Sequence, residues 1–323
     1  MKTLRGGFRI AGGGSPEYED RVPSGAGSST VVRAELYPYR RAELREMIIN
    51  SGAYTRIQFD KLESEGCGMV VANMLCVSPF SGFRSIISRR FSEGIITGLK
   101  VLMAALAADK GEAAVPAASA EVLRSCREAV SSSPNITLRP VQDRYPLGFD
   151  RVLYEKIYGG TPRGYYPGKS GCLVAGAEKL LDIYLAAETG GEPGFPVVGV
   201  CPGKTLLLWC RKGKSLRELS GEHKEISGKF YVSGGLLWGG PVLSSGDLRF
   251  DGSGLFFSLK GGKLRKNYCL GCGRCAAVCP VNLGGVTRSR LELDTVVSGK
   301  DAKNQECLRC GLCVYHCPGY SFK

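Results

Sequence analysis

Two cysteine runs near the end of the chain limit its fold more than any other feature. Each run reads C-x-x-C-x-x-C-x-x-x-C-P. The cysteines are Cys269, Cys272, Cys275 and Cys279 in the first run and Cys307, Cys310, Cys313 and Cys317 in the second. Three thiolates in one tight turn can bind three corners of an iron–sulfur cube, and this spacing is the bacterial-ferredoxin pattern for a [4Fe-4S] cluster. The sequence therefore predicts two such clusters.

The fourth cysteine of each run is expected to bind the other cluster, as is usual for this pattern. One cluster is then assigned to Cys269, Cys272, Cys275 and Cys317. The second is assigned to Cys307, Cys310, Cys313 and Cys279. Exchanged ligands of this kind tie the two halves of the domain together.

Other uses of the cysteines fit the spacing less well. A zinc ribbon needs four ligands in two C-x-x-C pairs, whereas eight cysteines fall here in two identical registers. A disulfide framework suits a short secreted chain, and the sequence starts without a signal-peptide pattern, so we expect a reducing compartment. A pair of clusters favours electron transfer over a structural role, because one cluster would suffice to rigidify a domain. The remaining cysteines are expected to be buried apolar residues: Cys67, Cys76, Cys126, Cys172, Cys201 and Cys210.

The chain is strongly basic, with a formal net charge of +13 over 323 residues. Between Lys260 and Lys323, eleven basic residues stand against four acidic ones. Part of this excess would offset the negative charge of thiolate-bound clusters. The rest suits an acidic redox partner such as a ferredoxin or flavodoxin, or an anionic membrane face. No nucleic-acid-binding motif accompanies it, and the longest apolar stretch, Ile95 to Ala108, is too short to span a membrane.

The pattern before the cysteine runs predicts an α/β fold. Residues 1–40 are rich in Gly, Ser and Pro, with a short strand expected at Val31 to Leu36. From residue 41 to 190 strands and helices alternate, and the longest predicted helix is Ser92 to Asp109, with Pro116 as the breaker that follows. Strands are expected at Gly68–Asn73 and Ile136–Pro140, and helices at Ala117–Ser131, Asp150–Ile157 and Ala177–Glu188.

Residues 191–258 have a different character. Stretches rich in β-formers, separated by Gly and Lys turns, predict a small β-grasp-like module. Its strands are expected at Phe195–Val200, Thr205–Arg211 and Lys229–Val232, with a hairpin between Leu248 and Leu259. Residues 259–323 then form the domain that holds the cysteine runs.

The order of these parts resembles a known family. The α/β domain with Tyr145-Pro146-Leu147-Gly148, the β module with Gly239-Gly240-Pro241 and the two cysteine runs are similar to the RnfC proteins of Rnf ferredoxin:NAD oxidoreductase complexes. That family is related to the flavin- and NADH-binding subunit of respiratory complex I. The resemblance implies a Rossmann-like α/β core, a small β-grasp (SLBB-like) module and a C-terminal ferredoxin-like helical domain with two [4Fe-4S] clusters.

The flavin-binding motifs of that family are altered here. Its G-x-G-G-A-G-F-P loop corresponds to residues 50–55, where most of the glycines that allow close approach to a phosphate are absent. Its N-G-A-E-C-E-P motif corresponds to residues 73–79, in which Cys76 and Ser78 replace the two glutamates. Bound FMN is therefore not favoured. The degenerate flavin site would comprise Asn50, Gly52, Ala53 and Tyr54 of the loop, and Asn73, Cys76 and Ser78 of the second motif.

The resemblance and its departures together imply an electron-transfer subunit that relays single electrons through its clusters and has no assigned catalytic residue. We expect it in the cytoplasm, peripheral on the inner face of the plasma membrane, in an Rnf-like complex or a related soluble reductase. Its partners would be other subunits of that complex and an acidic ferredoxin, flavodoxin or flavoprotein, and not nucleic acid. The alternative is a flavin-dependent NADH dehydrogenase or ferredoxin–NAD oxidoreductase subunit with a non-standard FMN loop.

Overall fold

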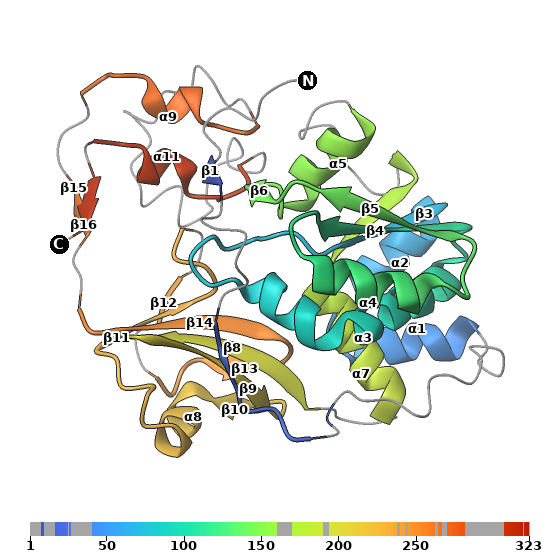
Figure 1. Cartoon of the computed structure of the whole chain (residues 1–323), viewed down its shortest axis with the longest axis horizontal. Coiled ribbons are helices and arrows are strands. Elements are labelled where there is room, and N and C mark those ends of the chain that lie inside the picture. The colour runs from blue at the N-terminus through green and yellow to red at the C-terminus, as the bar shows by residue number, and fades with distance from the viewer. Residues whose placement is uncertain are drawn as a thin grey trace.

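A computed structural model gives the fold of the chain (Figure 1). The strand expected at Val31 to Leu36 lies outside the residues that it describes. The described residues are 8–9, 17–24, 26, 41–159, 170–189, 194–237, 240–242, 245–261, 264–266, 270–281, 307–318 and 320–322.

A parallel sheet of four strands forms the centre of the α/β domain. In spatial order the strands are β5 (Ile136–Val141), β4 (Lys110–Pro116), β3 (Met69–Asn73) and β7 (Cys172–Gly176). β3, β4 and β7 are buried along almost their whole length, which is typical of parallel strands covered on both faces. The chain builds outward from β3 through β4 to β5, and then crosses to the opposite side of β3 to form β7. In open α/β sheets such a switch point leaves a crevice at the carboxyl ends of the strands, where ligands commonly bind.

Helices cover both faces of this sheet. One face carries α1 (Arg41–Asn50), α2 (Arg56–Glu65), α3 (Phe83–Leu106), α4 (Ala120–Val130) and α7 (Ala177–Thr189), and the other carries α5 (Asp150–Tyr158) (Figure 1). The alternation of strand side chains supplies both cores, since Val70 packs toward the first face and Val71 toward the second. α3 and α7 approach so closely that only glycine fits at position 98. A Cβ on Gly98 would lie 1.9 Å from the carbonyl oxygen of Leu180.

The β module is built on a mixed sheet of six strands. In spatial order they are β12 (Gly240–Val242), β11 (Phe230–Ser233), β14 (Gly254–Leu259), β8 (Phe195–Cys201), β9 (Lys204–Cys210) and β2 (Glu19–Asp20). β8 and β9 form an antiparallel hairpin, whereas β14 pairs with β8 in parallel. A small pair of strands, β10 (Lys214–Ser215) and β13 (Arg249–Phe250), lies beside α8 (Leu216–Glu222), whose start is fixed by a capping box between Ser215 and Glu218.

The α/β domain and the β module share one hydrophobic core. Buried residues of α3 and α7 belong to the same apolar cluster as those of β8, β9 and β14. Phe91 of α3 packs against Trp209 of β9 with 6.3 Å between the ring centroids. Phe91 also has non-helical backbone angles, so α3 is kinked where it meets the module. The two parts are therefore packed into one body.

In Figure 1 the described parts of the cysteine runs lie above the β module and to one side of the α/β domain. The first run includes the short helix α9 (Arg274–Ala277) and the second includes α11 (Leu312–Tyr315). β15 (Leu264–Lys266), before the first run, pairs with β16 (Tyr320–Phe322), after the second. β1 (Phe8–Arg9) pairs with β6 (Arg144–Tyr145) of the α/β domain.

Most of the predicted architecture is confirmed, but two predictions need correction and one strand is missing from them. The longest helix begins at Phe83 and ends at Leu106, so it starts nine residues earlier than the predicted Ser92. The strand β4 was not predicted. The hairpin predicted between Leu248 and Leu259 is wrong, because β13 pairs with β10 while β14 pairs with β8 and β11.

One further prediction agrees with the structure. The six cysteines outside the runs are all buried, as expected.

Within the described ranges, no helix is both long and apolar enough to cross a bilayer.

Candidate functional site

Both cysteine runs adopt the same local backbone. The second cysteine of each run stands between two residues with left-handed φ angles, Gly271 and Gly273 in the first run and Arg309 and Gly311 in the second. A one-turn helix follows and carries the third cysteine. Such turns direct backbone N–H groups toward an enclosed anion. The Arg309 N–H, for example, donates to Cys307 Sγ at 3.4 Å. The runs are thus shaped to wrap an anionic cluster.

Three other thiols of the two runs act electrostatically on Cys310. Burial, and then the charges of Cys313, Cys279 and Cys307, raise the pKa of Cys310 to about 12. Cys279 belongs to the first run, so its effect on Cys310 agrees with an exchange of fourth ligands between the runs. α9 and α11 are also in contact with each other. The arrangement fits a cluster held by Cys307, Cys310, Cys313 and Cys279.

The ligands predicted for the other cluster are described in part. Cys269 lies outside the described residues. Cys272 is exposed, while Cys275 and Cys317 are half-buried. Every cysteine in the described part of the chain is a free thiol, and within that part no three His, Cys, Asp or Glu side chains form a site for a single metal ion. The first run is therefore more exposed at its centre than the second.

Tyr145 connects the α/β domain to the second run. Its side chain is fully buried, its hydroxyl donates a hydrogen bond to the backbone carbonyl oxygen of Cys310, and its ring meets Phe149 edge-on at 5.9 Å between centroids. On another side, a Cβ on Gly311 would lie only 2.0 Å from the carbonyl oxygen of Leu237 in the β module. The second run is therefore held between the α/β domain and the β module.

The switch point of the parallel sheet is filled by an ion pair. Arg84 of α3 is buried, and its Nε and Nη2 atoms donate to Oε2 and Oε1 of Glu178 at 2.7 Å each. Its Nη1 atom donates to the carbonyl oxygen of Gly148 at 2.7 Å. A Cβ on Gly176, the last residue of β7, would lie 2.4 Å from Arg84 Nη2, so the guanidinium lies against the end of the strand. The chain's own side chains occupy this crevice.

Two residues of the predicted flavin site lie beside the ion pair. Asn73, at the end of β3, is fully buried, and its Nδ2 donates to the Gly148 carbonyl oxygen at 2.9 Å and to Asp150 Oδ1 at 3.1 Å. The Cys76 N–H donates to the two carboxylate oxygens of Asp143 at 3.1 and 3.2 Å. Burial raises the pKa of Asp143 to about 6 and that of the Cys76 thiol to about 12. Cys76 is therefore protonated at neutral pH and is not an activated nucleophile.

A third predicted residue, Tyr54, also reaches this region. Its side chain is buried, and its pKa is raised by burial and then by the charges of Asp150, Cys67 and Glu178. The two altered motifs therefore meet at the switch point, as parts of one ancestral site would.

The other predicted residues are placed differently. Asn50 is exposed at the end of α1, Gly52 is exposed in the turn that follows, and Ala53 is buried in the core. The Ser78 hydroxyl is buried without a hydrogen-bond partner among the described residues.

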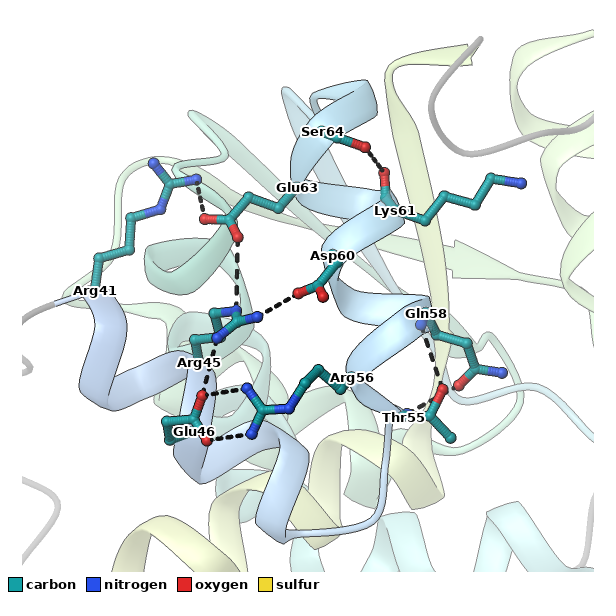
Figure 2. A network of polar contacts seen from close by, with 10 residues as sticks. All are labelled: Arg41, Arg45, Glu46, Thr55, Arg56, Gln58, Asp60, Lys61, Glu63 and Ser64. Atoms are coloured by element: carbon teal, nitrogen blue, oxygen red, sulfur yellow. Dashed lines mark hydrogen bonds and ion pairs between the residues drawn. The ribbon is translucent and has the colours of Figure 1, made fainter.

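The segment that corresponds to the flavin-phosphate loop is used here to join two helices. Thr55 caps α2 through a capping box, because its Oγ1 accepts the Gln58 N–H at 3.3 Å and Gln58 Oε1 accepts the Thr55 N–H at 3.0 Å. Arg56 donates two hydrogen bonds of 2.8 Å to Glu46 of α1. Figure 2 shows these contacts within a network of ion pairs between α1 and α2 that comprises Arg41, Arg45, Glu46, Arg56, Asp60 and Glu63.

The crevice does not fit a flavin phosphate. Phosphate binding needs accessible N–H donors and cations. The start of α2 is already capped by Thr55, and Arg84 is already bound by Glu178. Besides Glu178, Asp143 and Asp150 interact electrostatically with Arg84, and these carboxylates would repel a phosphate dianion. The described residues of this crevice therefore offer no cradle for FMN.

The sequence interpretation missed Arg84 and Glu178. Arg84 lies on the buried face of an apolar helix beside Phe83, Ile86 and Ile87. A charged residue in an apolar stripe is costly unless it is paired, so its position is a sequence signal for a buried partner. Nothing in the sequence alone identifies its partner Glu178, which lies at the start of α7, 94 positions after Arg84.

Comparison with known proteins assigns two parts of the chain. Residues 42–185 match the family model described as the Nuo51 FMN-binding domain, and residues 263–318 match the 4Fe-4S dicluster domain. The second match confirms the prediction of two [4Fe-4S] clusters. The altered motifs at residues 50–55 and 73–79 lie within the first match.

Relatives and solved structures agree with these assignments. The chain is 23% identical over 203 residues to the RnfC protein of the Na(+)-translocating ferredoxin:NAD(+) oxidoreductase complex of Acetobacterium woodii, a match that covers 59% of this chain and 45% of that protein. NAD+-reducing [NiFe]-hydrogenase shares the fold in its air-oxidized state (TM-score 0.56, 12% identity, 72% of this chain and 49% of that chain). The structure of its H2-reduced state is similar too, with a TM-score of 0.53 and 14% identity over 71% of this chain and 48% of that chain. The chain thus spans about half the length of these proteins. In order and kind its two matched parts are RnfC-like: one is similar to the Nuo51 FMN-binding domain and is followed by one similar to the 4Fe-4S dicluster domain.

Proposed function

We propose that this chain relays single electrons through two [4Fe-4S] clusters as a peripheral subunit of an Rnf-like redox complex, without oxidising NADH itself. The observation that carries the proposal is the pair of matching cysteine turns, whose short helices α9 and α11 are in contact with each other. When bound, each cluster accepts and releases one electron at a time.

We assign the ligands as the spacing predicts. One cluster would be held by Cys307, Cys310, Cys313 and Cys279, and the other by Cys269, Cys272, Cys275 and Cys317. The Arg309 N–H donates to the Cys307 sulfur, and the packing of Tyr145 excludes water from the Cys310 side. The exposed Cys272 side suits electron exchange with a partner.

The partners we propose are other subunits of the complex and an acidic ferredoxin, flavodoxin or flavoprotein. The basic excess between Lys260 and Lys323 supports an acidic partner, and it would equally favour peripheral contact with the anionic inner face of the plasma membrane from the cytoplasm. In this scheme segment 1–40 leads into the α/β domain 41–190, the β-grasp-like module 191–258 and the dicluster domain 259–323.

The direct test is anaerobic purification of the full chain, followed by quantification of iron, sulfide and flavin. We expect about eight irons, as many sulfides and no flavin. The clusters should bleach with dithionite and recover with a mild oxidant. Clusters that cannot be cycled in this way would contradict the relay and indicate a structural role.

A second candidate function is flavin-dependent NADH oxidation. The match of residues 42–185 to an FMN-binding domain favours it, and the filled switch point opposes it. The same preparation separates the two functions. Bound FMN together with saturable NADH oxidation that reduces the clusters would favour the dehydrogenase, whereas NADH that leaves dithionite-reducible clusters oxidised supports the relay.

A further inference from the structure

The two cysteine runs have the same backbone but different surroundings. Cys310, the second cysteine of its run, is 8% exposed, and the hydroxyl of Tyr145 donates to its carbonyl oxygen. Cys272 occupies the equivalent position of the first run and is exposed. The α/β domain therefore places a buried polar group at the centre of the second run.

The position of this hydroxyl is tightly determined. Tyr145 lies in β6, which pairs with β1, and its ring packs with Phe149, Val278 and Leu312 in one apolar cluster. Because the ring is fully buried, the hydroxyl cannot exchange the Cys310 carbonyl for water. A donor of this kind withdraws charge from the peptide of a ligating cysteine, which stabilises the reduced, more negative form of a cluster.

We propose that Tyr145 is a positioning residue that raises the reduction potential of one cluster only, the one assigned to Cys307, Cys310, Cys313 and Cys279. The inference rests on the proposed relay. The effect is confined to the second run, because Cys272 at the equivalent position of the first run is exposed.

The test is a redox titration of the full, cluster-loaded chain followed by electron paramagnetic resonance. Tyr145→Phe keeps the ring and removes the hydroxyl. We expect the equilibrium constant for reduction of one cluster to fall by up to about tenfold. This corresponds to a decrease of about 59 mV in the reduction potential of a one-electron couple. The potential of the other cluster should not change. The matched control is Tyr231→Phe, which removes a hydroxyl that also donates to a backbone carbonyl, that of Ile226 at 3.4 Å, within the β module. Neither potential should change in that variant.

A second variant separates the hydroxyl from packing. Phe149→Leu removes the edge-on ring contact and keeps the hydroxyl, so both potentials should stay near those of the wild type. Unchanged potentials in loaded Tyr145→Phe, equal shifts of both clusters, or the same shift in Phe149→Leu would overturn the role of Tyr145. Loss of iron in Tyr145→Phe, from about eight to about four or to none, would show a structural role and would likewise overturn the tuning of the potential. Wild-type protein without reducible clusters would instead contradict the relay itself.

Discussion

Arg84 and Glu178 close the carboxyl end of the parallel sheet with two hydrogen bonds of 2.7 Å, and the Arg84 side chain is only 5% exposed. The pair occupies the switch point, the place where an open α/β sheet commonly binds its ligand. An internal carboxylate therefore binds the buried guanidinium that a phosphate could have used. In this chain the end of the sheet is filled by its own side chains.

Arg84→Met should strongly destabilise the α/β domain. It leaves Glu178 partly buried without its partner, and breaking such a pair typically costs about 3 kcal/mol or more. The urea midpoint, followed by far-UV circular dichroism, should fall clearly. Arg56→Met is the matched control, since Arg56 also donates two hydrogen bonds to one glutamate but is exposed. Equal shifts in the two variants would contradict the structural role of the buried pair.

The double variant Arg84→Met, Glu178→Met tests whether the pair is retained for stability alone. Replacing both charges by apolar side chains of similar size removes the uncompensated charge, so much of the lost stability should return. If FMN binds to the wild type but not to this variant, the crevice is a flavin site after all. Titration of each protein with FMN, followed by flavin fluorescence, decides between these outcomes.

Asp182 of α7 contacts Ser253 of the β module. We expect this residue to make the free energy of unfolding depend on pH. Its carboxylate accepts hydrogen bonds from the Ser253 N–H at 3.0 Å and from the Ser253 hydroxyl at 2.5 Å, and burial raises its pKa to about 7. Because the folded pKa lies above the unfolded value near 3.8, the folded state holds the proton more tightly. Stability from this residue is therefore lost as the pH rises from about 4 to 7.

Asp182→Asn should remove that part of the pH dependence. The amide oxygen can still accept from Ser253, and no proton is released. Between pH 5 and 8, the free energy of unfolding should fall less steeply with pH in the variant than in the wild type. The two slopes should differ by at most about 1.36 kcal/mol per pH unit, the value for one proton. Identical slopes would show that Asp182 is ionised throughout. The exposed Asp247→Asn serves as the control.

The features predicted well from the sequence are those set by local spacing. Helix α7 is buried along one apolar stripe and was placed within one residue of its ends. β4 was not predicted because Gly111, Glu112 and Ala113 are poor strand formers. These residues are required by tertiary packing. A Cβ on Gly111 would lie 2.5 Å from Met103 Sδ, and Glu112 is paired with Arg139 of β5.

In the candidate site, too, the residues set by local spacing were predicted and those set by tertiary packing were not. The spacing of the runs predicted the thiols, and the family resemblance brought Tyr54, Asn73 and Cys76 to notice. What replaced the flavin site was not predictable, because Arg84 and Glu178 meet only after the sheet has been assembled. The contact of Tyr145 with Cys310 likewise joins residues 165 positions apart. Such pairs are properties of the fold and not of any local pattern.

Gly311→Ala should disturb the dicluster domain more than Gly273→Ala. Both glycines have φ near 70° and follow the second cysteine of their run, so each alanine adds a left-handed strain of about 1–2 kcal/mol. Only Gly311 of the two is crowded, since its Cβ would lie 2.0 Å from the Leu237 carbonyl oxygen, whereas a Cβ on Gly273 would meet no described heavy atom within 4 Å. Overpacking adds about 1–3 kcal/mol. Gly311→Ala should release iron at a lower urea concentration, and the reverse order would contradict the packing of this run on the β module.

Cys279→Ser should damage the same cluster as Cys310→Ser, although the two residues belong to different runs. The reason is that this spacing usually exchanges the fourth ligand between the runs, and that α9 and α11 are in contact with each other. Electron paramagnetic resonance of the reduced proteins should show the same signal lost or altered in both variants, with the signal of the other cluster retained. Cys272→Ser should affect the complementary signal, and Cys201→Ser, which changes a buried thiol of the β module, should affect neither. If Cys279→Ser instead matched Cys272→Ser, each run would bind its own cluster, and the exchange would be wrong.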